Sequence, residues 1–294
     1  MNSEEKKTST TTIFLIIGIA IVFVLIMFAI FSSPPSTQTP TSLRGLNVKF
    51  NGNTTLRSNT FFDLNFTISN PYEISIENTR IWVESGKLFT TLFAPLNNTT
   101  TIRTFPLILP KSNVTYYFGN VKVERVESEM RNVPIMMKIL YDLRFSRNFT
   151  INVVNNNSLK LYGGIENMGI KQDKKEIKSP LSISFSYDPK NFIFEEGRKT
   201  YAPFKVIIEN VGDGYCIDEI RLKLQSNRNI ICEYNKTQIV SDSEIFIEPT
   251  KRLEIMCNYT LSYLKEKDFD SVNSRISIYC KYLESKTFLF NILP

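Results

Sequence analysis

The chain contains no histidine. The remaining residues suited to chemistry are four cysteines, some closely spaced carboxylates and a run of lysines. Without histidine, Ser-His-Asp catalysis, Cys-His catalysis and histidine-based metal sites are impossible. The glycines are isolated turn signals rather than a phosphate-binding loop. We therefore expect no cofactor and no metal site.

Paired carboxylates are the remaining candidates for catalysis, because glycoside hydrolases use two of them. Glu195 and Glu196 are adjacent, and Glu127 and Glu129 are two residues apart. Neighbours in a strand point to opposite faces, and residues two apart share a face without forming a pocket. We interpret all four as solvated surface acids and predict that the protein is not an enzyme.

The cysteines all lie in the last third of the chain, at Cys216, Cys232, Cys257 and Cys280. Their spacing is wide, and a zinc site would need all four thiolates. Two disulfides formed in an oxidising compartment are the better interpretation, and four free buried thiols are the alternative. Three pairings are possible. An immunoglobulin-like strand order would favour Cys216 with Cys280 and Cys232 with Cys257.

An uncharged apolar run at residues 13–31 is long enough to cross a bilayer as one helix. It exceeds the apolar core of a cleaved signal peptide, which is the alternative. Basic residues precede the run more closely than they follow it, which places the N-terminus in the cytoplasm. The sequence thus predicts a cytoplasmic tail (1–12), a signal-anchor helix (13–31) and an extended Pro/Ser/Thr stalk (32–44).

Asn-x-Ser/Thr sequons agree with an extracellular body, although each one alone is only a hypothesis. The glycosylation candidates are Asn53, Asn65, Asn97, Asn98, Asn113, Asn148, Asn156, Asn235 and Asn258.

From residue 45 onward, short β-rich runs alternate with Asn, Pro and Gly, which indicates an all-β protein. We predict two tandem antiparallel immunoglobulin-like β-sandwich domains, at 45–170 and 181–294, with a charged linker at 171–180. Late in each domain we expect separate strands at 135–145, 149–154, 274–282 and 286–292. In the second domain, alternation places Phe204, Val206 and Ile208 on one inward face, and Ile217, Ile220, Leu222 and Leu224 on the next.

The linker carries a run of lysines that could contact an acidic group, although charge runs usually stay in water. This possible basic contact patch comprises Lys171, Lys174, Lys175 and Lys178.

Two stretches resemble known surface modules. Residues 204–224, FKVIIENVGDGYCIDEIRLKL, resemble the immunoglobulin-like modules of prokaryotic, archaeal-type surface proteins of the CARDB (cell-adhesion-related) kind, with Asn210, Gly212 and Gly214 matching their turn. Residues 62–83 resemble LEA14-like sandwich domains at the Asn-Pro turn. These resemblances imply a sandwich fold in a cell-surface setting, and they transfer no catalytic residue.

The sequence therefore predicts a single-pass cell-membrane glycoprotein with an extracellular body. The expected function is a scaffold or adhesion protein that contributes to a cell-envelope or surface-filament assembly through protein–protein contacts, self-association included. The alternative is a ligand- or glycan-binding ectodomain of a receptor, transport or secretion complex, with Trp82, Tyr116, Tyr117 and Tyr162 as candidate aromatics. The net charge of +6 is compatible with acidic glycans, and we expect no nucleic acid.

Overall fold

The computed structural model describes residues 45–83, 93–95, 102–172, 177–197, 200–226, 230–240, 243–265 and 267–294. Leu43–Pro294 form one compact unit. Within the described ranges, no helix is long and apolar enough to span a membrane. The predicted tail, anchor helix and stalk lie outside the described residues, so these predictions stay open.

The fold is almost entirely β, as the sequence predicts, with short 3-10 helices as its helical elements in the described ranges. A four-stranded sheet has the order β1 (Asn47–Phe50), β3 (Phe61–Ser69), β7 (Asn113–Val123), β5 (Phe93–Pro95). A five-stranded sheet has the order β10 (Leu181–Tyr187), β12 (Tyr201–Asn210), β18 (Arg252–Thr260), β15 (Ile230–Tyr234), β16 (Thr237–Val240).

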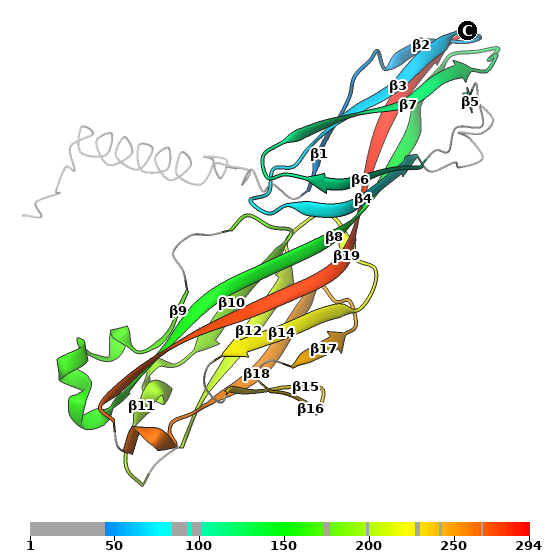
Figure 1. Cartoon of the computed structure of the whole chain (residues 1–294). Coiled ribbons are helices and arrows are strands. Elements are labelled where there is room, and N and C mark those ends of the chain that lie inside the picture. Colours follow the sequence, from blue (N-terminus) through cyan, green and yellow to red (C-terminus); the bar gives the residue numbers. More distant parts are fainter. Residues whose placement is uncertain are drawn as a thin grey trace, which may run out of the picture. The chain divides into compact units, whose positions relative to one another are not determined.

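The third sheet, called the long sheet here, contains both of the longest strands (Figure 1). Its main order is β17 (Glu244–Ile247), β14 (Ile220–Ser226), β19 (Phe269–Leu293), β8 (Met130–Asn155), β4 (Ile76–Val83), β6 (Ile102–Ile108). Short strands add to it: β2 (Thr55–Arg57) and β13 (Tyr215–Cys216) on β19, and β9 (Gly169–Gln172) and β11 (Ile193–Phe194) on β8. The 3-10 helices are η1 (Asn156–Tyr162), η2 (Ile165–Asn167), η3 (Pro189–Phe192) and η4 (Ser262–Lys265).

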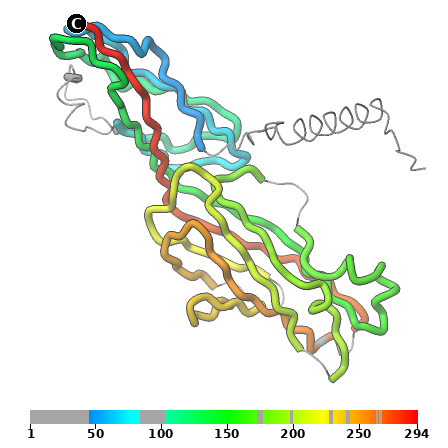
Figure 2. Tube along the Cα trace, turned by 180° about the vertical axis from the view of Figure 1, so that it is seen from behind, coloured from blue at the N-terminus to red at the C-terminus, as the bar shows by residue number. Residues whose placement is uncertain are grey.

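Strands β8 and β19 pair antiparallel along nearly their whole length, from Phe269 opposite Val154 to Phe290 opposite Val133. Figures 1 and 2 show them side by side from opposite directions. The breaks predicted at 146–148 and 283–285 are therefore wrong. Polar residues at these positions resemble turns in the sequence, but cross-strand pairing holds them in extended conformation.

Apolar side chains of the long sheet pack against both smaller sheets. Phe288 lies 4.9 Å from Phe66 of the four-stranded sheet, measured between ring centroids. Phe149 lies 4.6 Å from Phe185 of the five-stranded sheet. Alternate residues point into these layers, as period-two patterns require. The long sheet is thus the shared layer of both cores.

The inward faces predicted in the second half are largely confirmed. Phe204, Val206 and Ile208 of β12 are buried, and so are Ile220 and its alternate neighbours on β14. Ile217 is the exception, with 39% of its surface exposed, because it lies in the connection between β13 and β14 rather than on a strand.

The end of the chain differs from the expected tandem arrangement. Asn291 and Ile292 of β19 pair parallel with Thr55 and Leu56 of β2, so an early strand of the chain joins the long sheet beside the end of β19. At the expected linker, Lys171 already pairs with Thr150 inside the long sheet. The division into domains at 45–170 and 181–294 stays a prediction.

Candidate ligand-binding face

Cationic and aromatic side chains alternate in one row across four neighbouring strands of the long sheet. Tyr279 of β19 lies opposite Arg144 of β8 on one side and opposite Arg221 of β14 on the other. Arg221 in turn lies opposite Phe246 of β17. Each strand contributes these residues from positions that alternate with core residues, so all four project away from the core.

The rings hold the guanidinium groups in place. The Arg221 guanidinium carbon lies 5.3 Å from the ring centroid of Tyr279 and 5.4 Å from that of Phe246. The guanidinium of Arg144 lies 5.6 Å from the Tyr279 ring centroid. Cation–π contacts of this kind restrict the long arginine side chains while their N–H donors stay available to a ligand.

Two further cations lie on the same face in the neighbouring rows. Lys223 lies opposite Ser277 of β19 and opposite Glu244 of β17. Arg275 donates a hydrogen bond of 2.6 Å to the Ser146 hydroxyl. We call the whole set the cation–aromatic face, and it comprises Arg144, Arg221, Lys223, Phe246, Arg275 and Tyr279.

Carboxylates offset part of the positive charge of this face. Arg144 forms an exposed ion pair of 3.5 Å with Glu77. Among the described residues, no ion pair joins Arg221, Lys223 or Arg275 to a carboxylate. Partial burial and the neighbouring Asp142 carboxylate raise the pKa of Tyr279, so the phenol stays neutral at physiological pH. With Glu77, Asp142 and Glu244 beside its four cations, the face presents a small excess of positive charge and several hydrogen-bond donors.

The face is hollowed. A cavity of about 610 Å³ is lined by five of the six members, without Phe246, together with Glu244 and the hydroxyls of Ser146 and Ser277. Volumes of a few hundred Å³ are typical of sites for small molecules or short polymer segments. What the arrangement can do chemically is bind anionic groups; it offers no pair of carboxylates for acid–base catalysis.

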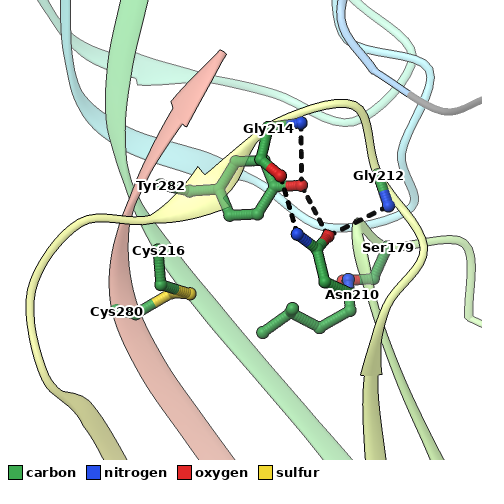
Figure 3. Close-up of a disulfide and its surroundings, with 8 residues drawn as sticks. Ser179, Asn210, Gly212, Gly214, Cys216, Cys280 and Tyr282 are labelled. Carbon is green, nitrogen blue, oxygen red and sulfur yellow. Dashed lines mark hydrogen bonds between the residues drawn. A yellow bond between two sulfur atoms is a disulfide. The ribbon is translucent and has the colours of Figure 1, made fainter. Parts of the chain in front are cut away.

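A turn stabilised by polar contacts packs against β19 at Tyr282. Asn210 donates a hydrogen bond of 2.6 Å to the Gly214 carbonyl and accepts one from the Gly212 N–H at 3.1 Å (Figure 3). The Tyr282 hydroxyl donates to Asn210 at 2.8 Å and accepts from the Gly214 N–H at 3.2 Å. A Cβ at position 214 would collide with the Leu283 carbonyl, so this position requires glycine.

Both disulfides have the pairing favoured by the strand order. Cys216 is bonded to Cys280, which ties β13 to β19 next to Tyr279 (Figure 3). Cys232 and Cys257 are direct cross-strand neighbours on β15 and β18. All four cysteines are buried. The covalent bonds thus hold β19, one of the strands that carry the cation–aromatic face, and join two strands of the five-stranded sheet.

A buried carboxylate anchors the point where the described chain begins. Glu284 is fully buried, and it accepts hydrogen bonds from the Leu46 N–H at 2.8 Å and from the Tyr141 hydroxyl at 2.8 Å. Tyr72 donates to the same carboxylate at 3.3 Å, and the Lys286 ammonium lies 3.7 Å away. Desolvation raises the pKa of Glu284, and these partners oppose the rise.

Two of the four lysines of the predicted basic contact patch belong to the described residues. Lys171 lies exposed on β9 and donates a hydrogen bond to Asn167 at 3.3 Å. Lys178 is exposed beyond the strand. Lys174 and Lys175 lie outside the described residues, so the patch as a whole stays a prediction.

The sequons differ in accessibility. Exposed side chains belong to Asn53, Asn113, Asn148, Asn156, Asn235 and Asn258. Asn65 is half-buried, and it accepts a hydrogen bond from Asn51 at 3.2 Å. Asn97 and Asn98 lie outside the described residues.

The candidate carboxylates remain separate from the cation–aromatic face. Glu129 is exposed and paired with Arg131 at 2.8 Å, which lowers the pKa of its carboxyl, the opposite of what a general acid needs. Glu127 is exposed. Glu195 and Glu196 line a separate hollow of about 330 Å³ beside three asparagines.

The candidate aromatics are also elsewhere: Tyr116 is buried, Trp82 is half-buried, and Tyr117 and Tyr162 are exposed. The cation–aromatic face is not among the sites that the sequence predicts. Its signal was the alternation on β14, where Arg221, Lys223 and Gln225 occupy the outward positions, but the register that aligns them with Tyr279 could not be read from one strand.

Comparisons with known proteins leave the family open. No protein-family model matches the chain, and no curated protein matches it. Among solved structures, the secreted serine protease VesC from Vibrio cholerae matches with 11% identity over 87% of this chain and 53% of that chain, at a TM-score of 0.22. The chain spans about half the length of that protein, and a similarity this low carries no argument about fold or activity.

Proposed function

We propose that this protein is a non-enzymatic, membrane-anchored extracellular protein of the scaffold or adhesion type that binds an acidic partner at the cell envelope. Its body consists of two immunoglobulin-like β-sandwiches, and the cation–aromatic face is its contact surface. The observation that carries this proposal is the row Arg144, Tyr279, Arg221, Phe246, in which aromatic rings flank two guanidiniums on exposed strands. Exposed arginines fixed in this way are typical of surfaces that recognise anionic groups.

The remaining features support the location. The apolar run at 13–31 supplies an anchor, and the Pro/Ser/Thr-rich segment after it supplies a stalk. Two disulfides suit an oxidising compartment outside the cytoplasm. The long pairing of β8 with β19 gives the body a continuous pair of hydrogen-bonded strands, which suits a rigid scaffold.

The test is retention of envelope material by the full-length protein in native membranes. Membranes are cross-linked, and the material that co-purifies with the protein is compared between wild type and the variant Arg221→Glu/Arg275→Glu. A matched control reverses two exposed lysines away from the face, Lys190→Glu/Lys251→Glu.

We expect wild type and control to retain the same partner, and the face variant to lose most of it, with the loss reproduced by raising the salt concentration. Equal retention by both variants, with both folded and disulfide-bonded, would exclude the cation–aromatic face as the contact surface.

A further inference from the structure

The size and shape of the cation–aromatic face restrict its ligand. Its hollow of about 610 Å³ suits a small molecule or a short stretch of polymer. A stable protein–protein interface buries roughly 1,200–2,000 Å² and takes most of its binding energy from a few central residues, among which tryptophan, tyrosine and arginine are enriched. Among the six members of the face, Phe246 is the large exposed apolar side chain, and it contacts Arg221. The face therefore offers cations and rings but no cluster of exposed apolar anchors.

The backbone of β14, β19 and β8 offers nothing to an incoming peptide strand, and the edge of this part of the sheet lies at the short strand β17. β14 is hydrogen-bonded to β17 on one side and to β19 on the other, and β19 is bonded to β8. Peptides that bind by strand addition need an unpaired sheet edge. Recognition over β14 and β19 must therefore come from side chains, which here are guanidinium, ammonium, hydroxyl and aromatic groups.

The cations are distributed rather than gathered around one point. Arg144 and Arg221 are two strands apart in one row, which separates their Cα atoms by about 10 Å. Arg275 lies four residues from Tyr279 along β19, about 13 Å away. A single small anion would contact only part of this array, whereas a polymer with repeated acidic groups contacts several cations at once.

The groups between the cations suit a polyhydroxylated chain. Ser146 and Ser277 line the hollow, and Glu244 adds an acceptor opposite Lys223. Sugar hydroxyls pair with such donors and acceptors, while carboxylates or sulfates on the sugars pair with the arginine forks.

Resting on the proposed function for this same surface, we propose that the acidic partner is a polysaccharide bearing carboxylate or sulfate groups, bound across β8, β19, β14 and β17. The arginines of the face bind its acidic groups, and the serine hydroxyls bind its sugar hydroxyls.

The test measures binding of the full-length protein in detergent to four immobilised probes. Polygalacturonate and heparin represent carboxylated and sulfated polysaccharides, dextran is the neutral polysaccharide, and poly-glutamate is the acidic peptide. Wild type is compared with Arg221→Glu/Arg275→Glu and with the control Lys190→Glu/Lys251→Glu, after thermal unfolding has shown that each is folded.

We expect at least one acidic polysaccharide to bind, dextran not to bind, and the affinity to fall with salt. The face variant should weaken this binding by about tenfold or more, and the control should leave it unchanged. The contrary result is that poly-glutamate binds as tightly as the acidic polysaccharides and loses its binding in the face variant. That result would overturn the proposal of a polysaccharide ligand and assign the face to an acidic protein.

Failure of the two proposals can be distinguished. If no polysaccharide binds while envelope retention still depends on Arg221 and Arg275, the ligand class is wrong and the contact surface stands. If neither binding nor retention depends on these residues, both proposals fail.

Discussion

The backbone N–H of Leu46 donates a hydrogen bond of 2.8 Å to the carboxylate of Glu284, 238 residues later in the chain. Leu46 lies directly before β1, and Glu284 is in the middle of β19. The same carboxylate accepts the Tyr141 hydroxyl from β8. A single buried side chain thus connects the first described residues to both long strands.

Replacing this carboxylate by the isosteric amide should destabilise the fold. In Glu284→Gln, the amide oxygen can accept from the tyrosines only if the NH₂ group faces the Leu46 N–H, so one buried donor loses its acceptor. We expect the free energy of unfolding to fall by about 1–3 kcal/mol. Urea unfolding measures this, with the exposed Glu127→Gln as control; equal stabilities of the two variants would contradict a structural role for Glu284.

Stability should also depend on pH through Glu284. Because burial raises its pKa, the folded protein retains the proton to a higher pH than the unfolded chain does. The stabilisation linked to this group is therefore complete below the ordinary carboxyl range and is lost as pH rises through the raised pKa. Tyr72 and Tyr141, whose pKa values burial also raises, stay neutral throughout.

The measurement is the difference in unfolding free energy between wild type and Glu284→Gln across this pH range. We expect the difference to shrink as pH increases. A difference that grows with pH would mean that Lys286 and the hydrogen bonds outweigh desolvation.

The hydroxyl of Tyr282 should contribute to stability in addition to the packing of its ring. Tyr282→Phe removes the donor to Asn210 and the acceptor for the Gly214 N–H, while the ring stays packed. We expect a loss of about 1 kcal/mol in the free energy of unfolding, because two part-buried polar groups lose a hydrogen-bond partner. Tyr201→Phe is the control, since Tyr201 is 50% exposed. The measurement is the unfolding temperature of each variant. If both temperatures shift by the same amount, the hydrogen bonds of Tyr282 do not contribute to stability.

The two disulfides should contribute unequally. Cys216–Cys280 closes a loop with a sequence separation of 64, and Cys232–Cys257 closes one of 25. Chain entropy predicts about 4 kcal/mol for the first and about 3.5 kcal/mol for the second. Replacing each pair by serines and measuring urea unfolding tests the order. A larger loss from removing Cys232–Cys257 would show that native-state packing dominates.

On the cation–aromatic face, geometry should matter beyond charge. Arg221→Lys keeps the positive charge but loses the planar fork that contacts Tyr279 and Phe246. We expect binding of the acidic polysaccharide to weaken by about two- to fivefold. Lys223→Arg is the matched control and should not weaken it. Identical affinities for wild type and Arg221→Lys would mean that the face binds its ligand through positive charge alone.

Much of the fold follows from local sequence pattern. Alternation identifies the inward residues of β12, and the wide cysteine spacing indicates disulfides rather than a metal site. These features succeed because burial on one sheet face imposes a period of two wherever the strand lies.

What the sequence hides depends on long-range pairing. Ser146 and Glu284 resemble turn residues, yet they pair opposite Ser277 and Ile139 in unbroken strands. Glu284 in particular is tolerated inside the protein only because Leu46, Tyr72 and Tyr141 supply donors from distant segments. The cation–aromatic face was missed for the same reason, since its row exists only after four strands are placed in register.

The parallel pairing of β2 with the end of β19 has a consequence for biosynthesis. Thr55 and Leu56 are synthesised long before their partners Asn291 and Ile292. β2 therefore cannot form this pairing until β19 has left the ribosome. A nascent chain that has not yet reached β19 exposes strand groups that are paired in the finished fold, so it depends on protection from aggregation.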